Sequence, residues 1–124
     1  MKEIHEFFEN FSSDFSHFNG NLIAERYFAP FIPVTSSGEA KTLNSHSEIS
    51  SYFQGYLDTY KEKGVVACTF KDFEWLQIGE NAFVAIVTWL LTDENDGVII
   101  SWRESYNLLR QEGQLLVYSS ANFK

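Results

Sequence analysis

Cysteine is almost absent from this chain of 124 residues, and the only one is Cys68. A single thiol excludes an intrachain disulfide and a zinc site built from several cysteines. The three histidines, His5, His17 and His46, show none of the short spacings that are typical of metal ligands. Glycine-rich nucleotide-binding motifs are missing as well. We therefore expect no metal and no cofactor, and we expect Cys68 to be a buried structural thiol.

Positive charge is also scarce, because 9 Lys and Arg stand against 17 Asp and Glu and the formal net charge is -8. Nucleic acids and anionic membrane surfaces bind clustered positive charge, so neither is an expected partner. No apolar run approaches the ~18–20 residues that a membrane span needs. Acidic residues interrupt the apolar positions near Met1, so we expect no signal peptide. These absences predict a cytoplasmic protein.

Aromatic side chains are plentiful, by contrast, and make up 17% of the residues, with 12 Phe, 6 Tyr and 3 Trp. The hydrophobic fraction of 44% is typical of a globular protein. The length suits one domain and leaves no room for two, so we predict a single domain over residues 1–124.

Two amphipathic segments open the chain. Apolar residues recur every three or four positions from Ile4 to Phe18, which predicts a helix that ends at Asn19-Gly20. Asn21 is then expected to cap a short second helix, Leu22–Phe28.

A third helix is predicted to begin at Ser45 and Glu48, which fit a capping box, and to end near Lys63, before Gly64. Its apolar face carries Ile49, Tyr52, Phe53, Tyr56, Leu57 and Tyr60.

The remaining segments have the pattern of β-strands. Prolines bracket an edge strand, and we predict a short hairpin of Phe31–Thr35 with Glu39–Leu43. Four longer runs joined by short turns predict an antiparallel meander: Val65–Ile78, Ala82–Thr92, Val98–Gln111 and Gln114–Phe123. Helices on one side of such a sheet define an α+β domain. Because a sheet this long must curl, the helices on its concave side should leave a cone with one open end.

Several short patterns follow one another along nearly the whole chain: the Phe-rich first helix, Leu22–Pro30, Ser45-x-x-Glu48-Ile49-x-x-Tyr52-Phe53, Asp58-x-Tyr60-x-x-x-Gly64, Gly79-Glu80-Asn81-Ala82 and Arg103-x-Ser105-Tyr106-x-Leu108-x-Arg110-x-x-Gly113. In this order they resemble the NTF2-like superfamily, and within it the SnoaL-like proteins. The resemblance implies a cone-shaped, cystatin-like fold, in which a curved antiparallel sheet packs on three N-terminal helices around a pocket. It also implies a homodimer and a wide range of functions, from isomerases, cyclases and dehydratases to hub domains and binding proteins.

The sequence departs from the enzymes of this superfamily in two places. Ketosteroid-isomerase-like members have a catalytic acid at the end of the first strand and a tyrosine in the first helix, whereas this chain has Val34-Thr35-Ser36-Ser37-Gly38 and only phenylalanines. Many SnoaL-like members have an inward-facing histidine in the last strand, where this chain has Ala121. Both departures favour binding over catalysis.

Alternation along the strand Val98–Gln111 predicts which side chains face the pocket. Its even positions are more apolar than its odd positions, so the even set should face inward and Arg103 outward. Glu104 would then lie between Trp102 and Tyr106, where desolvation would raise its pKa and suit it to general acid or base chemistry. The alternative is a position at the open mouth, or a structural pairing with Arg or Tyr.

Three tyrosines, Tyr52, Tyr56 and Tyr60, share one face of the predicted third helix. Their hydroxyls could orient a polar group of a ligand, or the rings could simply complete the core. Trp75, Trp89 and Trp102 similarly fit a ligand wall, the core or an interface.

These features favour a small-molecule-binding domain with an apolar, aromatic-lined pocket and a mostly apolar or aromatic ligand. The candidate binding residues are Tyr52, Tyr56, Trp102, Glu104 and Tyr106. An alternative is a SnoaL-like isomerase, cyclase or dehydratase, with Glu104 as general base and Tyr106 as hydrogen-bond donor. A second alternative is a protein-interaction domain that acts through the convex face of the sheet.

The strand Ala82–Thr92 is apolar at both parities, so a monomer would leave one apolar row in water. We therefore expect a homodimer through the convex face of the sheet, because a two-fold axis covers this row with a matching surface.

Overall fold

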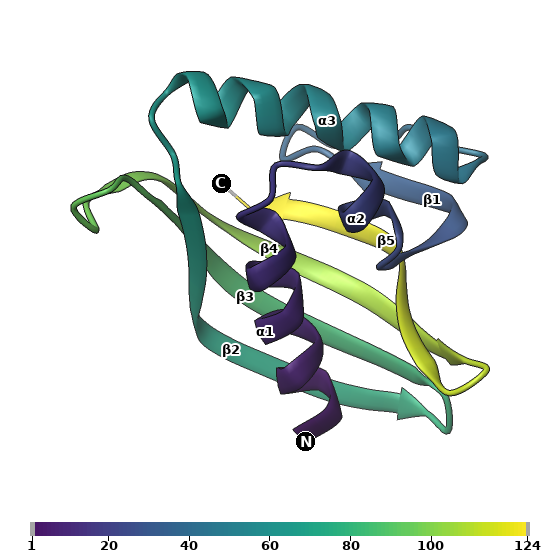
Figure 1. Ribbon diagram of the computed structural model, residues 1–124. Coiled ribbons are helices and arrows are strands. Elements are labelled where there is room, and N and C mark those ends of the chain that lie inside the picture. The colour runs from purple at the N-terminus through teal and green to yellow at the C-terminus, as the bar shows by residue number, and fades with distance from the viewer. Residues whose placement is uncertain (1, 124) are drawn as a thin grey trace.

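The computed structural model shows residues 2–123 as three helices packed against one face of a curved five-stranded sheet (Figure 1). Met1 and Lys124, the two ends of the predicted domain 1–124, lie outside the described residues. The elements are α1 (Lys2–Phe15), α2 (Gly20–Ala24), β1 (Tyr27–Val34), α3 (His46–Glu62), β2 (Ala67–Gly79), β3 (Ala82–Thr92), β4 (Val98–Gln111) and β5 (Gln114–Phe123). The strand order is β1-β5-β4-β3-β2. The predicted α+β class, with helices on one face of a curved sheet, is confirmed.

The four long strands pair antiparallel, as the sequence predicts, whereas β1 joins the sheet parallel to β5. Of the predicted hairpin, only two isolated bridges form, Phe31 with Leu43 and Val34 with Ala40. Phe31 and Leu43 exchange two backbone hydrogen bonds of 2.9 Å, and Lys41 donates to the carbonyl of Pro33. Residues 39–43 therefore pair with the edge of β1 that faces away from β5.

The second helix differs from its predicted range of Leu22–Phe28. Asn19, and not Asn21, is the N-cap residue, because its side-chain oxygen accepts from the Asn21 amide at 2.9 Å. The next residue, Gly20, lies against α3 so closely that a Cβ atom there would be 2.4 Å from the carbonyl oxygen of Ser50. The helix then ends early, and Tyr27 begins β1 by pairing with Val117.

The third helix agrees with its predicted boundaries. The hydroxyl of Ser45 accepts from the Glu48 amide at 3.1 Å and caps the first turn. After Lys63, Gly64 adopts a φ of +92°, the left-handed conformation that glycine tolerates best.

The core lies between the helices and the inner face of the sheet. The predicted apolar stripe of α1 is buried, and the odd positions of β3 alternate with its half-buried even positions. The buried residues include Ile4, Phe8, Phe11, Phe83, Val87, Trp89 and Leu91. No helix among residues 2–123 has the length and hydropathy to cross a membrane.

Bulges within β2 and β5 change the direction of side chains along these strands. In β2 the register shifts between Lys71 and Glu74, where Asp72 has a φ of +52°. In β5, Leu108 opposes Val117 but Asn107 opposes Ser119, so Tyr118 is an extra residue.

The bulge at Tyr118 overturns one sequence-based prediction. One extra residue reverses the alternation, so Ser120 opposes the inward-facing Tyr106, and Ala121 opposes Ser105 on the outer face. The inward positions of this strand are therefore Ser120 and Asn122, and the expectation that Ala121 faces the pocket is wrong.

Candidate functional site

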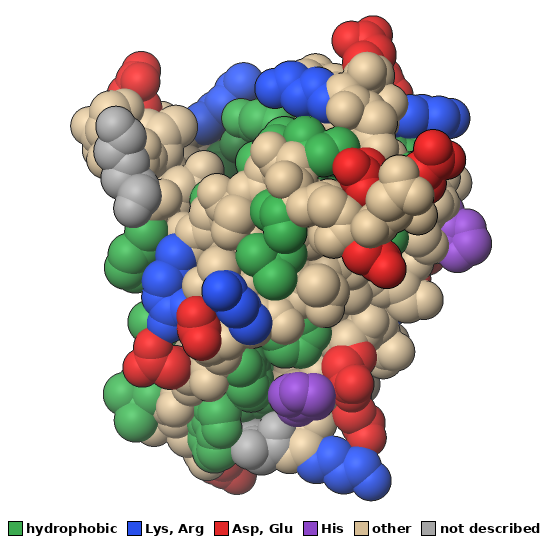
Figure 2. Space-filling model, turned by 90° about the vertical axis from the view of Figure 1, so that its left-hand side faces the viewer, with side chains coloured by type: hydrophobic (Ala, Val, Ile, Leu, Met, Phe, Trp, Pro, Cys, Tyr) green, Lys and Arg blue, Asp and Glu red, His purple; other side chains and the backbone are tan. Residues whose placement is uncertain are grey.

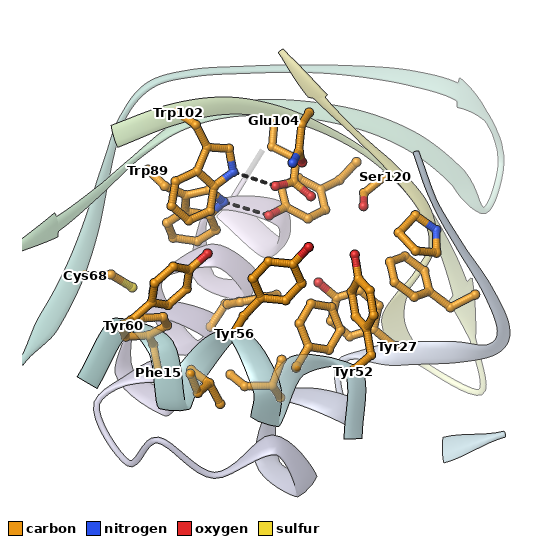
Figure 3. Close-up of a pocket in the computed structure, with 18 of the residues that line it drawn as sticks. Phe15, Tyr27, Tyr52, Tyr56, Tyr60, Cys68, Trp89, Trp102, Glu104 and Ser120 are labelled. Atoms are coloured by element: carbon orange, nitrogen blue, oxygen red, sulfur yellow. Dashed lines mark hydrogen bonds between the residues drawn. The ribbon is translucent and has the colours of Figure 1, made fainter. Parts of the chain in front are cut away.

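A cavity of about 150 Å³ lies between α3 and the inner face of the sheet, and its walls are mostly aromatic (Figure 3). A cavity of this size holds a ligand of about one benzene ring. Tyr56, Thr35 and Asn122 line the cavity and are exposed to solvent, so they mark its mouth. Phe11 and Phe15 of α1 and Trp89 of β3 also line the cavity, and all three are buried.

The structure brings all five predicted site residues to this one cavity. Tyr52 and Tyr56 come from α3, and Trp102, Glu104 and Tyr106 come from alternate positions of β4. Arg103, between them in sequence, lies on the outer face and forms an ion pair with Glu74. The predicted inward direction of Glu104 is confirmed, whereas the roles of the five residues in binding or catalysis stay predictions.

Glu104 accepts a hydrogen bond from the indole of Trp102, two residues earlier on the same strand (Figure 3). The distance between Trp102 Nε1 and the carboxylate oxygen is 2.7 Å. A second tryptophan is linked to the carboxylate through Tyr106. Trp89 Nε1 donates a hydrogen bond of 2.6 Å to the hydroxyl oxygen of Tyr106, and Tyr106 in turn hydrogen-bonds to Glu104. The carboxylate is therefore fixed in the cavity wall by a neutral donor.

Burial raises the pKa of the Glu104 carboxyl, and hydrogen bonds from Trp102, Ser120 and Tyr106 lower it in part. Burial, together with the neighbouring Tyr56 and Glu104, raises the pKa of Tyr60 to about 12. The pKa of Tyr52 is raised as well, first by burial and then by Tyr56. The hydroxyls of Tyr52 and Tyr60 thus remain protonated near neutral pH and can both donate and accept hydrogen bonds.

One carboxyl group faces the cavity. Among the described residues that line it, Glu104 is the only Asp or Glu, and none is Lys, Arg or His. No cluster of three or more potential metal-ligating side chains occurs within residues 2–123. The site can therefore hold an apolar body and one polar or positively charged group.

Several residues that line the cavity were not among the predicted site residues, and they include Tyr27, Tyr60, Ser120 and Asn122. Tyr27 was expected in a helix, and its place in β1 depends on a parallel pairing that local sequence does not reveal. Ser120 and Asn122 were hidden by the bulge at Tyr118. Tyr60 was recognisable, because it continues the four-residue spacing of Tyr52 and Tyr56.

Cys68, His5 and His17 lie in different parts of the fold. Cys68 is half-buried at the cavity wall, its Sγ lies 3.8 Å from the carbonyl oxygen of Ser12, and burial raises its pKa to about 12. The thiolate is thus scarce at neutral pH, as expected for a structural thiol. His5 packs its ring edge-on against Phe70 and Phe73, and His17 is exposed.

Comparison with known proteins gives the family. The family model described as NTF2-like protein (DUF6841) matches residues 2–122. The chain belongs to this NTF2-like family. The resemblance found in the sequence is thereby confirmed for the superfamily. No curated protein matches this NTF2-like chain.

Solved structures share the fold of this NTF2-like protein at low sequence identity. An NTF2-like protein with a cystatin-like fold from Novosphingobium aromaticivorans is similar with a TM-score of 0.77 and 10% identity, over 98% of this chain and 79% of the other. Aln2 from a Streptomyces species is similar with a TM-score of 0.76 and 13% identity, over 98% and 88%. A ketosteroid isomerase-like protein from Erwinia carotovora atroseptica is similar with a TM-score of 0.68 and 13% identity, over 99% and 94%. At these identities the likeness shows the fold alone, and the predicted cystatin-like architecture is confirmed.

Proposed function

We propose that this NTF2-like protein binds a small, mostly apolar or aromatic molecule in the cavity beneath α3. The observation that carries the proposal is a cavity of about 150 Å³ whose walls are mostly aromatic. Binding sites for small molecules are typically concave and apolar, with a few polar groups that fix the orientation of the ligand. Glu104, Ser120 and the tyrosine hydroxyls supply such groups here.

The proposal is tested by titration calorimetry with 2-phenylethanol, a neutral one-ring probe. We expect saturable binding to the wild-type protein and strongly weakened binding to Asn122→Trp, because Asn122 is exposed at the mouth of the cavity. The matched control is Asn95→Trp, in the exposed turn between β3 and β4. Equal binding by both variants, or no binding by the wild type, would contradict the proposal.

Catalysis by Glu104 is the second candidate, in the form of a SnoaL-like isomerase, cyclase or dehydratase. It is supported by the raised pKa of this carboxyl and by the Tyr106 hydroxyl beside it. A base whose pKa lies closer to neutral transfers protons more effectively near neutral pH. The test is proton exchange: the wild type should catalyse hydrogen–deuterium exchange at an activated carbon of a bound one-ring ketone, and Glu104→Gln should not.

We also propose that the protein forms a homodimer through the outer face of the sheet. The supporting residues are the half-buried Val84, Ile86 and Leu90 of β3, and Leu76 of β2 beside them, which is 62% exposed. Figure 2 views the molecule from the side on which β2 begins, and hydrophobic side chains lie there among charged ones. The outer face of the sheet would also be the binding surface if the protein is a protein-interaction domain.

A cytoplasmic location remains a prediction from the sequence.

A further inference from the structure

The acidic side chain of the cavity has no basic counterpart. Each arginine of the chain is engaged by a carboxylate away from the cavity: Arg26 by Asp14, Arg103 by Glu74 and Arg110 by Glu3. The donors that reach Glu104 are neutral: the Trp102 indole and the hydroxyls of Ser120 and Tyr106. When Glu104 is ionised, its charge is hydrogen-bonded but not neutralised by any described residue of the cavity wall.

Aromatic rings surround this carboxylate. Tyr56 and Tyr60 extend from α3 toward Glu104, and the rings of Tyr60 and Trp102 are stacked with their centres 6.1 Å apart (Figure 3). The ring of Tyr52 follows along α3, 5.2 Å from that of Tyr56. Aromatic faces attract positive charge, and the attraction is strongest where water is excluded.

One of these rings already attracts an ammonium group of the protein itself. The Nζ atom of Lys41 lies 5.7 Å from the centre of the Tyr52 ring. Lys41 is exposed and does not line the cavity, so it is not a partner of Glu104.

We propose that the ligand is an organic cation of about one ring in size, such as a protonated aromatic amine. Its positive group would lie beside Glu104 and among the rings of Tyr56, Tyr60 and Trp102, and its apolar part would contact the phenylalanines beneath. The ammonium would donate hydrogen bonds to the carboxylate and to tyrosine oxygens. This inference rests on the proposed function and names its class of ligand.

The opposite charge does not suit the cavity. A carboxylate or phosphate ligand would approach Glu104 without any basic side chain to balance it, and two like charges at short range repel each other strongly in a site of low polarity. A neutral ligand would fit the apolar walls but would leave the charge of Glu104 unpaired. Positive, neutral and negative ligands of the same shape should therefore bind the cavity with different affinities.

The experiment compares phenethylamine, 2-phenylethanol and phenylacetate, which share one ring and a two-carbon chain and differ in charge. Calorimetry in 0.15 M salt should show that the amine binds the wild type at least about tenfold more tightly than the alcohol, and that phenylacetate binds most weakly. In Glu104→Gln the preference for the amine should disappear, while the alcohol still binds. The matched control is Glu62→Gln, which removes one negative charge from the exposed end of α3 and should keep the preference.

The outcomes separate this inference from the proposed function. Equal affinities of amine and alcohol for the wild type would overturn the inference and leave a binding cavity standing. A preference that survives in Glu104→Gln, or that vanishes in 0.5 M salt, would also overturn it, because it would then arise from the net charge of -8. If none of the three probes binds, the proposed function fails and the inference fails with it.

A second variant covers the case in which Glu104→Gln does not fold. Tyr56 is 47% exposed, so Tyr56→Leu should fold, and it removes one ring from the surroundings of the ammonium. We expect it to weaken binding of the amine more than binding of the alcohol. Equal weakening of the two would contradict the placement of the positive group.

Discussion

The indole Nε1 of Trp89 donates a hydrogen bond of 2.6 Å to the hydroxyl oxygen of Tyr106, and both side chains are buried. An indole can only donate, so the tyrosine oxygen must accept and its proton is free to point elsewhere. Glu104 lies close enough for that hydroxyl to lower the pKa of its carboxyl. Two strands of the sheet thus position the carboxylate through one shared hydroxyl group.

A double-mutant cycle tests this contact. Trp89→Phe and Tyr106→Phe each leave a buried polar atom without its partner, so each should lower the free energy of unfolding by about 1–3 kcal/mol. Because the double variant loses both polar atoms together, we expect a coupling free energy of about 1 kcal/mol. Urea unfolding of the four proteins measures it, and additive losses would show that the hydrogen bond contributes nothing.

The raised pKa of Glu104 predicts a pH-dependent stability. Between the usual value of 4.5 and its higher value in the folded protein, the native state holds a proton that the unfolded state releases. The stability that this group contributes is therefore complete below 4.5 and is lost as pH rises through its folded pKa. Glu104→Gln should thus gain stability relative to the wild type as pH rises through this window.

Chemical denaturation of both proteins from pH 4 upward measures this difference, and NMR titration of the Glu104 carboxyl carbon gives the pKa directly. A difference in stability that stays constant or falls with pH would contradict the prediction.

The buried face of α3 predicts the cost of truncating its side chains. Leu57 is 3% exposed, and Phe53 packs with its ring centre 4.8 Å from that of Tyr27. Replacing either residue by Ala should lower the free energy of unfolding by about 2–5 kcal/mol, through lost contacts and a new cavity. Lys63→Ala, at the exposed end of the helix, should cost less than about 0.5 kcal/mol. Equal small losses of unfolding free energy in all three variants would mean that Phe53 and Leu57 do not pack in the core.

The proposed homodimer predicts a mass near twice 14.3 kDa at micromolar concentration. Light scattering coupled to gel filtration measures it, and a monomer mass would remove the proposal. Val84→Glu places a charge beside Leu76 on the outer face and should yield the monomer. Val98→Glu introduces the same change beside the turn at residues 93–97 and should leave the dimer intact.

The local sequence pattern was sufficient to predict the direction of side chains where a strand pairs without a bulge. Along β4 the alternation holds from Trp102 to Leu108, so the inward direction of Glu104 could be derived from the sequence. The capping residues of α3 were equally informative, because Ser45 and Gly64 act through the backbone within a few residues of themselves.

Features that depend on distant segments could not be derived in this way. The extra residue Tyr118 has no signature in the sequence of β5, yet it decides that Ser120 and not Ala121 faces the cavity. Tyr27 enters the cavity because β1 pairs with β5, at the other end of the chain. Such a contact is specified by the packing of the whole fold and not by neighbouring residues.

The two edges of the open sheet differ in how they are closed to other chains. An unpaired strand edge offers backbone groups that can recruit a strand from another molecule and start aggregation. At one edge of the sheet, residues 39–43 form backbone hydrogen bonds with β1. At the other edge, the bulge at Asp72 interrupts β2, and the charged side chains of Lys71 and Glu74 flank it. Both features disfavour growth of the sheet by strand addition, which leaves the face of the sheet, and not its margin, for the proposed dimer.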